Sequence, residues 1–335
     1  MEALKRFVGQ LQPTQQCETQ IRVLLCGVDV QSMCADVLQC ACRAGNIEAV
    51  QTLLAHTSLS WNTTDSEGCD VGRTALLCGH RRLYAWLVGE GVRSEFVLAC
   101  TGTRFANEQL EVDTNQVSNQ TYLDSKLTFS VDAVVDAGCN AVMMAWETPL
   151  MAQHCHVLPI HAKNVLNVGF GLGVIDRLIQ DLHPCSHTII EAHPGALSLT
   201  ADVYSQMVAN GWNEKPNVKI IFGRWQDVLH QLECYDAIFF DTFGEYYADL
   251  KQFHDHVPNI LDQHGVYSYF NGLCGTNQFF HDVACGISEC DLHECQLQVK
   301  YIDVEMDKLD DDVWKDIRRP YWSLPIYRVP VVTFI

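Results

Sequence analysis

Apolar runs of strand length recur between helical stretches through the second half of the chain. The runs beyond Pro159 are Val165–Gly169, Thr188–Glu191, Val218–Phe222, Ala237–Asp241 and Val266–Phe270. Alternation of this kind predicts an α/β fold, in which a parallel sheet carries helices on both faces. The last stretch, Pro325–Ile335, is apolar and rich in β-branched residues, which predicts a final strand or hairpin arm.

The first hundred residues have a different pattern, of helices joined by short turns, and contain an internal repeat. Ala41–Asn46 resembles Ala75–His80, and aligning their glycines gives an offset of 79 − 45 = 34 residues. A helix–Gly–helix pattern with a period of about 33 residues is typical of ankyrin repeats. We therefore expect an α-helical, ankyrin-like domain over residues 1–105, with an extra unit within residues 1–33. Such a domain is either a protein-recognition surface or a structural appendage.

A polar segment without periodicity separates these two patterns. Residues 106–120 are rich in Asn, Gln, Asp and Ser and show no recurring apolar position. We expect a linker there, because such composition favours loops. The α/β domain then occupies residues 121–335.

The charge of the chain narrows the choice of partner. The formal net charge is −19 at pH 7, which argues against direct binding of nucleic acid, since nucleic-acid binders usually present a basic surface. A strongly acidic protein attracts cationic partners such as a basic polypeptide. The same charge is also compatible with an ordinary soluble acidic enzyme.

The cysteines and the N-terminus bear on metal binding and on the compartment. The 16 Cys residues include no CxxC pair, and the group Cys285, Cys290, His293 and Cys295 matches no standard zinc spacing. Buried free thiols in a reducing compartment explain them better than a metal site does. No signal-peptide or bilayer-length apolar segment occurs, so we expect a soluble protein of the cytoplasm, with the nucleus as a second location.

A glycine-rich turn follows the first predicted strand of the α/β domain. Gly169, Gly171 and Gly173 form GxGxG, and glycines there permit a tight turn and a close approach of the backbone to a ligand. The second strand ends in Glu191, 191 − 169 = 22 residues after the first glycine. An acid at this position hydrogen-bonds a ribose diol. Both features fit a nicotinamide or an S-adenosylmethionine site.

Three features favour S-adenosylmethionine. The glycine spacing is GxGxG and not GxGxxG. Trp225 follows the third strand and is placed to cover an adenine face, with Gln226 or Asp227 at its edge; core packing is the alternative for the indole. Asp241 ends the fourth strand, where reacting groups of open α/β sheets lie, although it also suits a helix N-cap.

The ordered motifs resemble a known family. Val142–Met151 (ValMetMetAlaTrpGluThrProLeuMet) lies upstream of the sheet, and Tyr122–Phe129 (TyrLeuAspSerLysLeuThrPhe) lies before it. Together with GlyPheGlyLeuGly, IleIleGluAlaHis, TrpGlnAsp and PheAspThrPhe, they resemble the type IV (delta-nitrogen) protein arginine methyltransferases, relatives of guanidinoacetate methyltransferase. The resemblance implies a class I S-adenosylmethionine methyltransferase fold, Rossmann-like, with a mostly parallel seven-stranded sheet.

The resemblance also implies which residues hold the cofactor and the acceptor. The implied cofactor-binding residues are Tyr122, Met143, Gly169, Phe170, Gly171, Leu172, Gly173, Val174, Glu191, Ala192, His193, Trp225, Gln226 and Asp241. A guanidino acceptor is implied between Glu147 and Asp241, with Met151 and Asn271 also in its pocket. The sequence after Asn271 departs from the small-molecule enzyme, and the SerGlu-x-Met-Gly and ThrHisTrp loops of the common arginine methyltransferases are absent.

Two carboxylates suit this chemistry. The acceptor guanidinium and the sulfonium of the cofactor are both cations, so Glu147 and Asp241 would offset their repulsion and hold the planar group by bidentate hydrogen bonds. The proton lost after methylation would pass to a nearby carboxylate such as Asp241. First-turn helix stabilisation is the structural alternative for Glu147.

The favoured function is therefore methylation of the delta nitrogen of an arginine in a basic protein. The acceptor known for the type IV group is a ribosomal protein, and we expect a monomer without a metal. The alternatives are a small-molecule guanidino methyltransferase, a non-catalytic ankyrin adaptor and a nicotinamide oxidoreductase.

Overall fold

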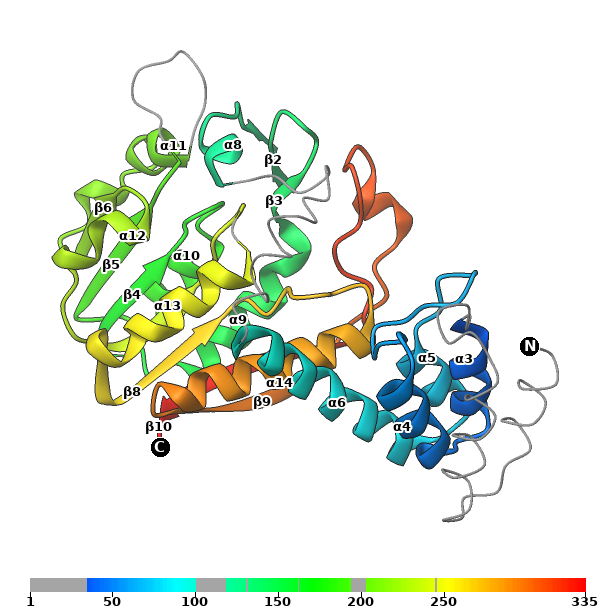
Figure 1. Cartoon of the computed structure of the whole chain (residues 1–335). Helices are drawn as coiled ribbons and strands as arrows, with labels where there is room; N and C mark the ends of the chain where they lie inside the picture. The colour runs from blue at the N-terminus through cyan, green and yellow to red at the C-terminus, as the bar shows by residue number, and fades with distance from the viewer. Residues whose placement is uncertain (1–34, 101–118, 131, 162, 194–202, 245) are drawn as a thin grey trace. The chain divides into compact units, whose positions relative to one another are not determined.

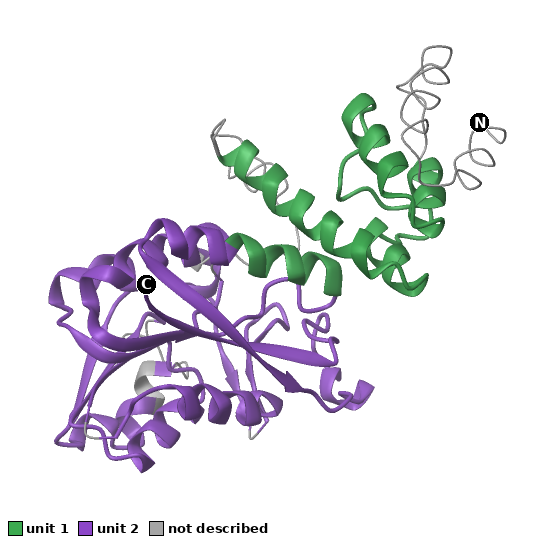
Figure 2. Ribbon diagram, turned by 90° about the horizontal axis from the view of Figure 1, so that it is seen from below, with its two compact units in different colours: residues 1–108, 277–287 green, residues 109–276, 288–335 purple. Residues whose placement is uncertain are grey.

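The computed structural model describes residues 35–100, 119–130, 132–161, 163–193, 203–244 and 246–335 (Figure 1). The chain divides into two compact units (Figure 2). Unit 1 comprises residues 1–108 and 277–287, and unit 2 comprises residues 109–276 and 288–335. The extra helical unit expected within residues 1–33 lies outside the described residues, and so does most of the expected linker.

Unit 2 is built on a seven-stranded sheet in the order β6-β5-β4-β7-β8-β10-β9. The strands are β4 (Asn164–Val168), β5 (Ser186–Glu191), β6 (Val218–Phe222), β7 (Tyr235–Phe240), β8 (Leu261–Tyr269), β9 (Leu297–Glu305) and β10 (Ile326–Phe334). The first five strands in this order are parallel, and β10 runs antiparallel to both β8 and β9. The expected Rossmann-like, mostly parallel seven-stranded sheet of a class I methyltransferase is therefore confirmed.

Helices cover both faces of this sheet (Figure 1), because both faces of its central strands are apolar. On one face Val165, Ala237 and Phe239 pack against α9 (Thr148–Val157) and α10 (Val174–Asp181). On the other, Leu166 and Phe240 pack with α13 (Tyr247–Ile260) and the last turns of α14 (Gln278–Glu294). The alternation of strand residues thus fills two separate cores.

A small three-stranded antiparallel sheet precedes the main one. Its strands are β1 (Thr128–Phe129), β2 (Ala133–Val135) and β3 (Ala141–Met144), followed by the 3₁₀ turn η2 (Ala145–Glu147). The sequence reasoning missed these strands because two to four residues are too few to establish a period. It also missed β9, which is exposed at alternate residues and contains no continuous apolar run.

The other elements of unit 2 are short. They are the helices α8 (Asn119–Leu123), α11 (Val203–Ala209) and α12 (Trp225–Val228), and the 3₁₀ helices η3 (Trp212–Glu214), η4 (Leu229–Gln231) and η5 (Asp311–Trp314). Among the described residues, no helix is both long enough and apolar enough to cross a membrane.

Unit 1 contains two helix–turn–helix pairs with a glycine at each turn. The helices are α3 (Ala35–Arg43), α4 (Ile47–His56), α5 (Val71–Leu77) and α6 (Arg81–Cys100). Gly45 and Gly79 have φ of +66° and +78°, a left-handed conformation that ends a helix at little cost for glycine. The His80 ring packs over Gly45 and bonds the Arg43 carbonyl at 2.9 Å. The aligned alanines, Ala41 and Ala75, are fully buried.

Candidate functional site

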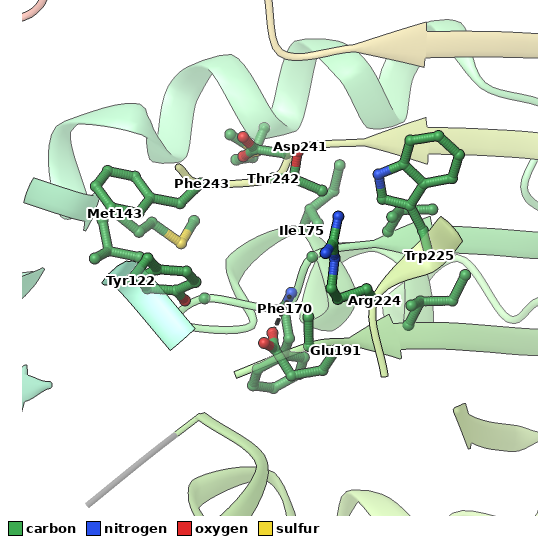
Figure 3. A pocket seen from close by; sticks show the side chains of 17 residues that line it. Tyr122, Met143, Phe170, Ile175, Glu191, Arg224, Trp225, Asp241, Thr242 and Phe243 are labelled. Atoms are coloured by element: carbon green, nitrogen blue, oxygen red, sulfur yellow. Dashed lines mark hydrogen bonds between the residues drawn. The ribbon is translucent and has the colours of Figure 1, made fainter. Parts of the chain in front are cut away.

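A cavity of about 700 Å³, including the solvent at its mouth, lies at the carboxyl ends of β4, β5 and β7 (Figure 3). The predicted site residues that line it are Tyr122, Met143, Met151, Gly169, Phe170, Gly171, Glu191, Ala192, Trp225 and Asp241. Those that do not line it are Glu147, Leu172, Gly173, Val174, His193, Gln226 and Asn271. Residues without an expected role also contribute, namely Val142, Val168, Ile175, Ile190, Arg224, Thr242 and Phe243.

The glycine-rich turn brings backbone to the floor of the cavity. Gly169 has φ of +95°, and a Cβ there would lie 1.9 Å from the carbonyl oxygen of Asp241. Only glycine therefore lets the ends of β4 and β7 approach this closely. Gly173 is the N-cap of α10 and has a left-handed conformation, and it packs against the Phe170 ring. Leu172, Gly173 and Val174 thus support the turn beside the cavity.

The carboxylate of Glu191 ties the glycine-rich turn to the end of β5. It accepts the amide protons of Phe170 at 3.0 Å and of His193 at 2.7 Å, and Figure 3 shows the first of these bonds. Burial raises the pKa of Glu191, against the amide hydrogen bonds that lower it. Ala192 lines the cavity next to it, so β5 ends in a buried acid held in one orientation.

Aromatic and sulfur-containing side chains form one wall. The Tyr122 ring lies 4.8 Å from the His193 ring and 4.9 Å from the Phe243 ring, centroid to centroid. His193 bonds the Ser125 carbonyl at 3.0 Å, so it supports the segment carrying Tyr122 without itself reaching the cavity. The Met143 sulfur accepts the Leu172 amide proton at 3.1 Å. These contacts fasten the small sheet and α8 over the turn.

Trp225 both packs in the core and lines the cavity. The indole is 2% exposed and packs on Phe253 at 5.2 Å between ring centroids, so its core-packing interpretation holds alongside the expected contact with the cavity. Gln226 does not line the cavity. Arg224, which the sequence reasoning missed, extends into the cavity (Figure 3). Its position directly before Trp225, at the end of β6, was the available signal.

Glu147 and Asp241 come from separate elements and lie close together. Asp241 lines the cavity just after β7, and Glu147 is 4% exposed at the end of η2. Burial, and then the negative charge of Glu147, raises the pKa of Asp241 well above its usual value. Burial raises the pKa of Glu147 to about 7, against hydrogen bonds from Tyr321 and the Met144 amide, which lower it. A buried carboxylate beside a half-buried one that lines the cavity favours a cation between them.

Asn271 faces the sheet instead of the cavity. Its backbone amide donates to the Tyr327 hydroxyl at 2.8 Å, and its side-chain amide donates to the Arg328 carbonyl at 3.1 Å. Tyr327 also bonds His154 at 2.9 Å, in a buried network that ties β8 to β10. Met151, by contrast, is fully buried and lines the cavity.

The residues present fit S-adenosylmethionine. A buried acid at the end of β5 suits a ribose diol, and backbone at Gly169 and Gly171 is open to a ligand. Apolar side chains such as Ile175 and Ile190 also line the cavity, and an adenine ring requires apolar neighbours. Asp241 in the lining, with the Glu147 carboxylate acting on it, offers negative charge to a cationic sulfur and a cationic acceptor.

Comparison with known proteins agrees with these features. The model of the guanidinoacetate N-methyltransferase family matches residues 117–304. Proteins named protein arginine N-methyltransferase 2 are similar over most of the chain. That of Aspergillus oryzae is 36% identical over 318 residues, covering 82% of this chain and 75% of the relative. The Aspergillus fumigatus protein is 34% identical, with 92% and 82% covered, and the Cryptococcus neoformans protein is 36% identical, with 85% and 81% covered.

Proposed function

The chain belongs to the protein arginine N-methyltransferase 2 family, within the wider guanidinoacetate N-methyltransferase group, and from that premise we propose how its site works. The protein is an S-adenosylmethionine-dependent enzyme that methylates arginine in a protein substrate. S-adenosylmethionine supplies an electrophilic methyl group on a sulfonium. The residues of the chain bind, orient and neutralise the two partners of this transfer.

The pair formed by buried Glu147 and half-buried Asp241 is the observation that carries the proposal. Neither carboxylate is ion-paired with any described residue, burial raises the pKa of both, and the charge of Glu147 raises that of Asp241 further. A guanidinium placed between them would offset both effects and donate bidentate hydrogen bonds to the carboxylates. Held in this way, its attacked nitrogen is oriented toward the cofactor, which is the main requirement of an in-line displacement.

The proton balance also favours this pair. A guanidinium is protonated at neutral pH, and methylation adds a carbon to a nitrogen that must then lose a proton. Asp241 lines the cavity and has a raised pKa, so it is placed to accept that proton. Exclusion of water by Met151 and the surrounding apolar side chains strengthens every electrostatic contact there.

The finer assignments are the delta nitrogen as the methylated atom and a basic, ribosomal protein as the acceptor. Support for the nitrogen comes from the type IV sequence motifs. Support for a basic partner comes from the net charge of −19. The two helix–Gly–helix pairs of unit 1 support an ankyrin-like recognition surface. A monomer located in the cytoplasm or the nucleus completes the proposal.

The experiment incubates the protein with methyl-labelled S-adenosylmethionine and a ribosome-rich extract, followed by acid hydrolysis and amino-acid analysis. We expect label in delta-methylarginine from one small basic protein, and none with Glu147→Gln. Label in a terminal-nitrogen derivative would overturn the nitrogen assignment. Label only in a free guanidino compound would replace the protein substrate with a small molecule.

A further inference from the structure

The segment between β9 and β10 passes over the side of the site that holds Glu147. It is tied down by backbone hydrogen bonds from Arg318 to the Cys139 carbonyl at 2.8 Å and from Ser323 to the Gly275 carbonyl at 2.9 Å. Cys139 belongs to the turn between β2 and β3, and Gly275 follows the end of β8. Residues 306–325 are therefore fixed to two segments that neighbour the site.

Tyr321 of this segment reaches the acceptor carboxylate. Its hydroxyl donates to Oε1 of Glu147 at 2.5 Å, while the Met144 amide donates to Oε2 at 3.1 Å. The Tyr321 ring is held against Trp146 at 5.5 Å and Trp314 at 5.1 Å between ring centroids. Each oxygen of Glu147 thus has one fixed donor, and the phenol is prevented from rotating away by two indoles.

We propose that Tyr321 is a positioning residue that keeps Glu147 ionised and correctly turned for the acceptor guanidinium, an inference that rests on the proposed function. A carboxylate has about four lone-pair sites. The Tyr321 hydroxyl and the Met144 amide use two of these, one on each oxygen. The two lone-pair sites that remain, one on each oxygen, can accept the two parallel N–H bonds of a planar guanidinium.

The groups around Glu147 explain why a donor is needed there. Asp241, after β7, faces it with a like charge, and Tyr321 and Tyr327 are uncharged phenols whose own pKa values are raised, first by burial. No basic side chain among the described residues is paired with Glu147. Within the described part of the chain, the groups that favour its charged form are then the Tyr321 hydroxyl and the Met144 amide. A hydrogen bond to a charged group is worth more than one between neutral groups.

Tyr321→Phe removes the hydroxyl and keeps the ring. The acidic limb of the pH profile of turnover should move about one unit toward alkaline pH, so turnover falls about tenfold at pH 6 and recovers above pH 9. The Kd for S-adenosylmethionine should stay within twofold. The matched control is Tyr301→Phe, which removes a hydroxyl from β9 that bonds the Tyr269 hydroxyl at 3.1 Å; its profile should equal that of the wild type.

A second readout does not depend on activity. In protein labelled with ¹³C at the glutamate carboxyls, Glu147→Gln identifies the Glu147 resonance, and its titration midpoint should rise in Tyr321→Phe. An unchanged midpoint, or equal loss of turnover at every pH, would overturn the positioning role while leaving methyl transfer by the wild type intact. If the wild type transfers no methyl group to any polypeptide, the proposed function fails, and the carboxyl titration still decides the role of Tyr321.

Discussion

Replacing Glu147 with glutamine should stabilise the protein at alkaline pH. Glu147 is 4% exposed, and burial raises its pKa from 4.5 to about 7. Because the folded state prefers the protonated acid, this group contributes stability that is fully present below pH 4.5. That stability is lost as the pH rises through 7. Glutamine has nearly the same shape and cannot ionise, so it escapes the loss.

The magnitude follows from the shift. A rise of 2.5 units, from 4.5 to about 7, corresponds to about 3 kcal/mol between the two ends of the titration. Near pH 5.5 the wild-type side chain is neutral when folded but mostly ionised when unfolded, so the variant should already be more stable by about 1–1.5 kcal/mol. Near pH 8.5 the variant should be more stable by about 2–3 kcal/mol, since Asp241 also loses a negative neighbour.

The assay is urea unfolding of the ligand-free protein at pH 5.5, 7.0 and 8.5, followed by circular dichroism. Every other titrating group is present in both proteins, so the difference between them reports position 147 together with its electrostatic coupling to Asp241. The control is Asp236→Asn: burial alone would raise the pKa of Asp236, but Lys163 and the Asn164 amide hold it below its usual value. That variant should lose stability at all three pH values. A pH-independent difference for Glu147→Gln would refute the buried, uncompensated carboxylate.

Three further predictions concern the scaffold of the site. Gly169→Ala should weaken S-adenosylmethionine binding more than tenfold in calorimetry and lower stability by more than about 1 kcal/mol, because the new Cβ would collide with the Asp241 carbonyl; normal affinity would contradict the close approach. Glu191→Gln should raise the Kd for the cofactor about tenfold while turnover at saturating cofactor stays within a few-fold; a lower turnover at unchanged Kd would exclude its ribose role. His154→Phe should cost about 2–3 kcal/mol in urea unfolding, because it removes the ring nitrogens that bond the Tyr327 and Ser268 hydroxyls. Because burial lowers the pKa of His154 from 6.5 to about 3, only the unfolded wild type takes up this proton at pH 5.5, so the cost should be smaller there by about 1–1.5 kcal/mol than at pH 8.5. An equal cost at both pH values would show a histidine that is charged in the folded protein.

Most of the main sheet was predictable, because buried parallel strands are continuous apolar runs bounded by turn residues. The run predicted at Val218–Phe222 is a strand with the same bounds, and the last strand begins one residue later than predicted. Edge strand β9 could not be predicted in this way, because its exposed positions are polar and leave only an alternating pattern. Strand β8 begins at Leu261, five residues before its predicted start, directly after α13. Its first residues are half polar, so tertiary pairing with β7 and not local composition extends it.

The local sequence alone determined the turn at Gly169–Gly173 and the acids at the ends of β5 and β7. The turn depends on a local backbone conformation and the two acids depend on where a strand ends, and neighbouring residues in the sequence determine both of these features. The tertiary structure decided what lies opposite them. Glu147 acts on Asp241 although the two are 241 − 147 = 94 residues apart in the sequence. Tyr321 bonds Glu147 although these two are 321 − 147 = 174 residues apart. Contacts of this range arise from the packing of whole elements, which no periodicity encodes, so the carboxylate pair could be placed only by resemblance and its phenol donor only by the folded chain.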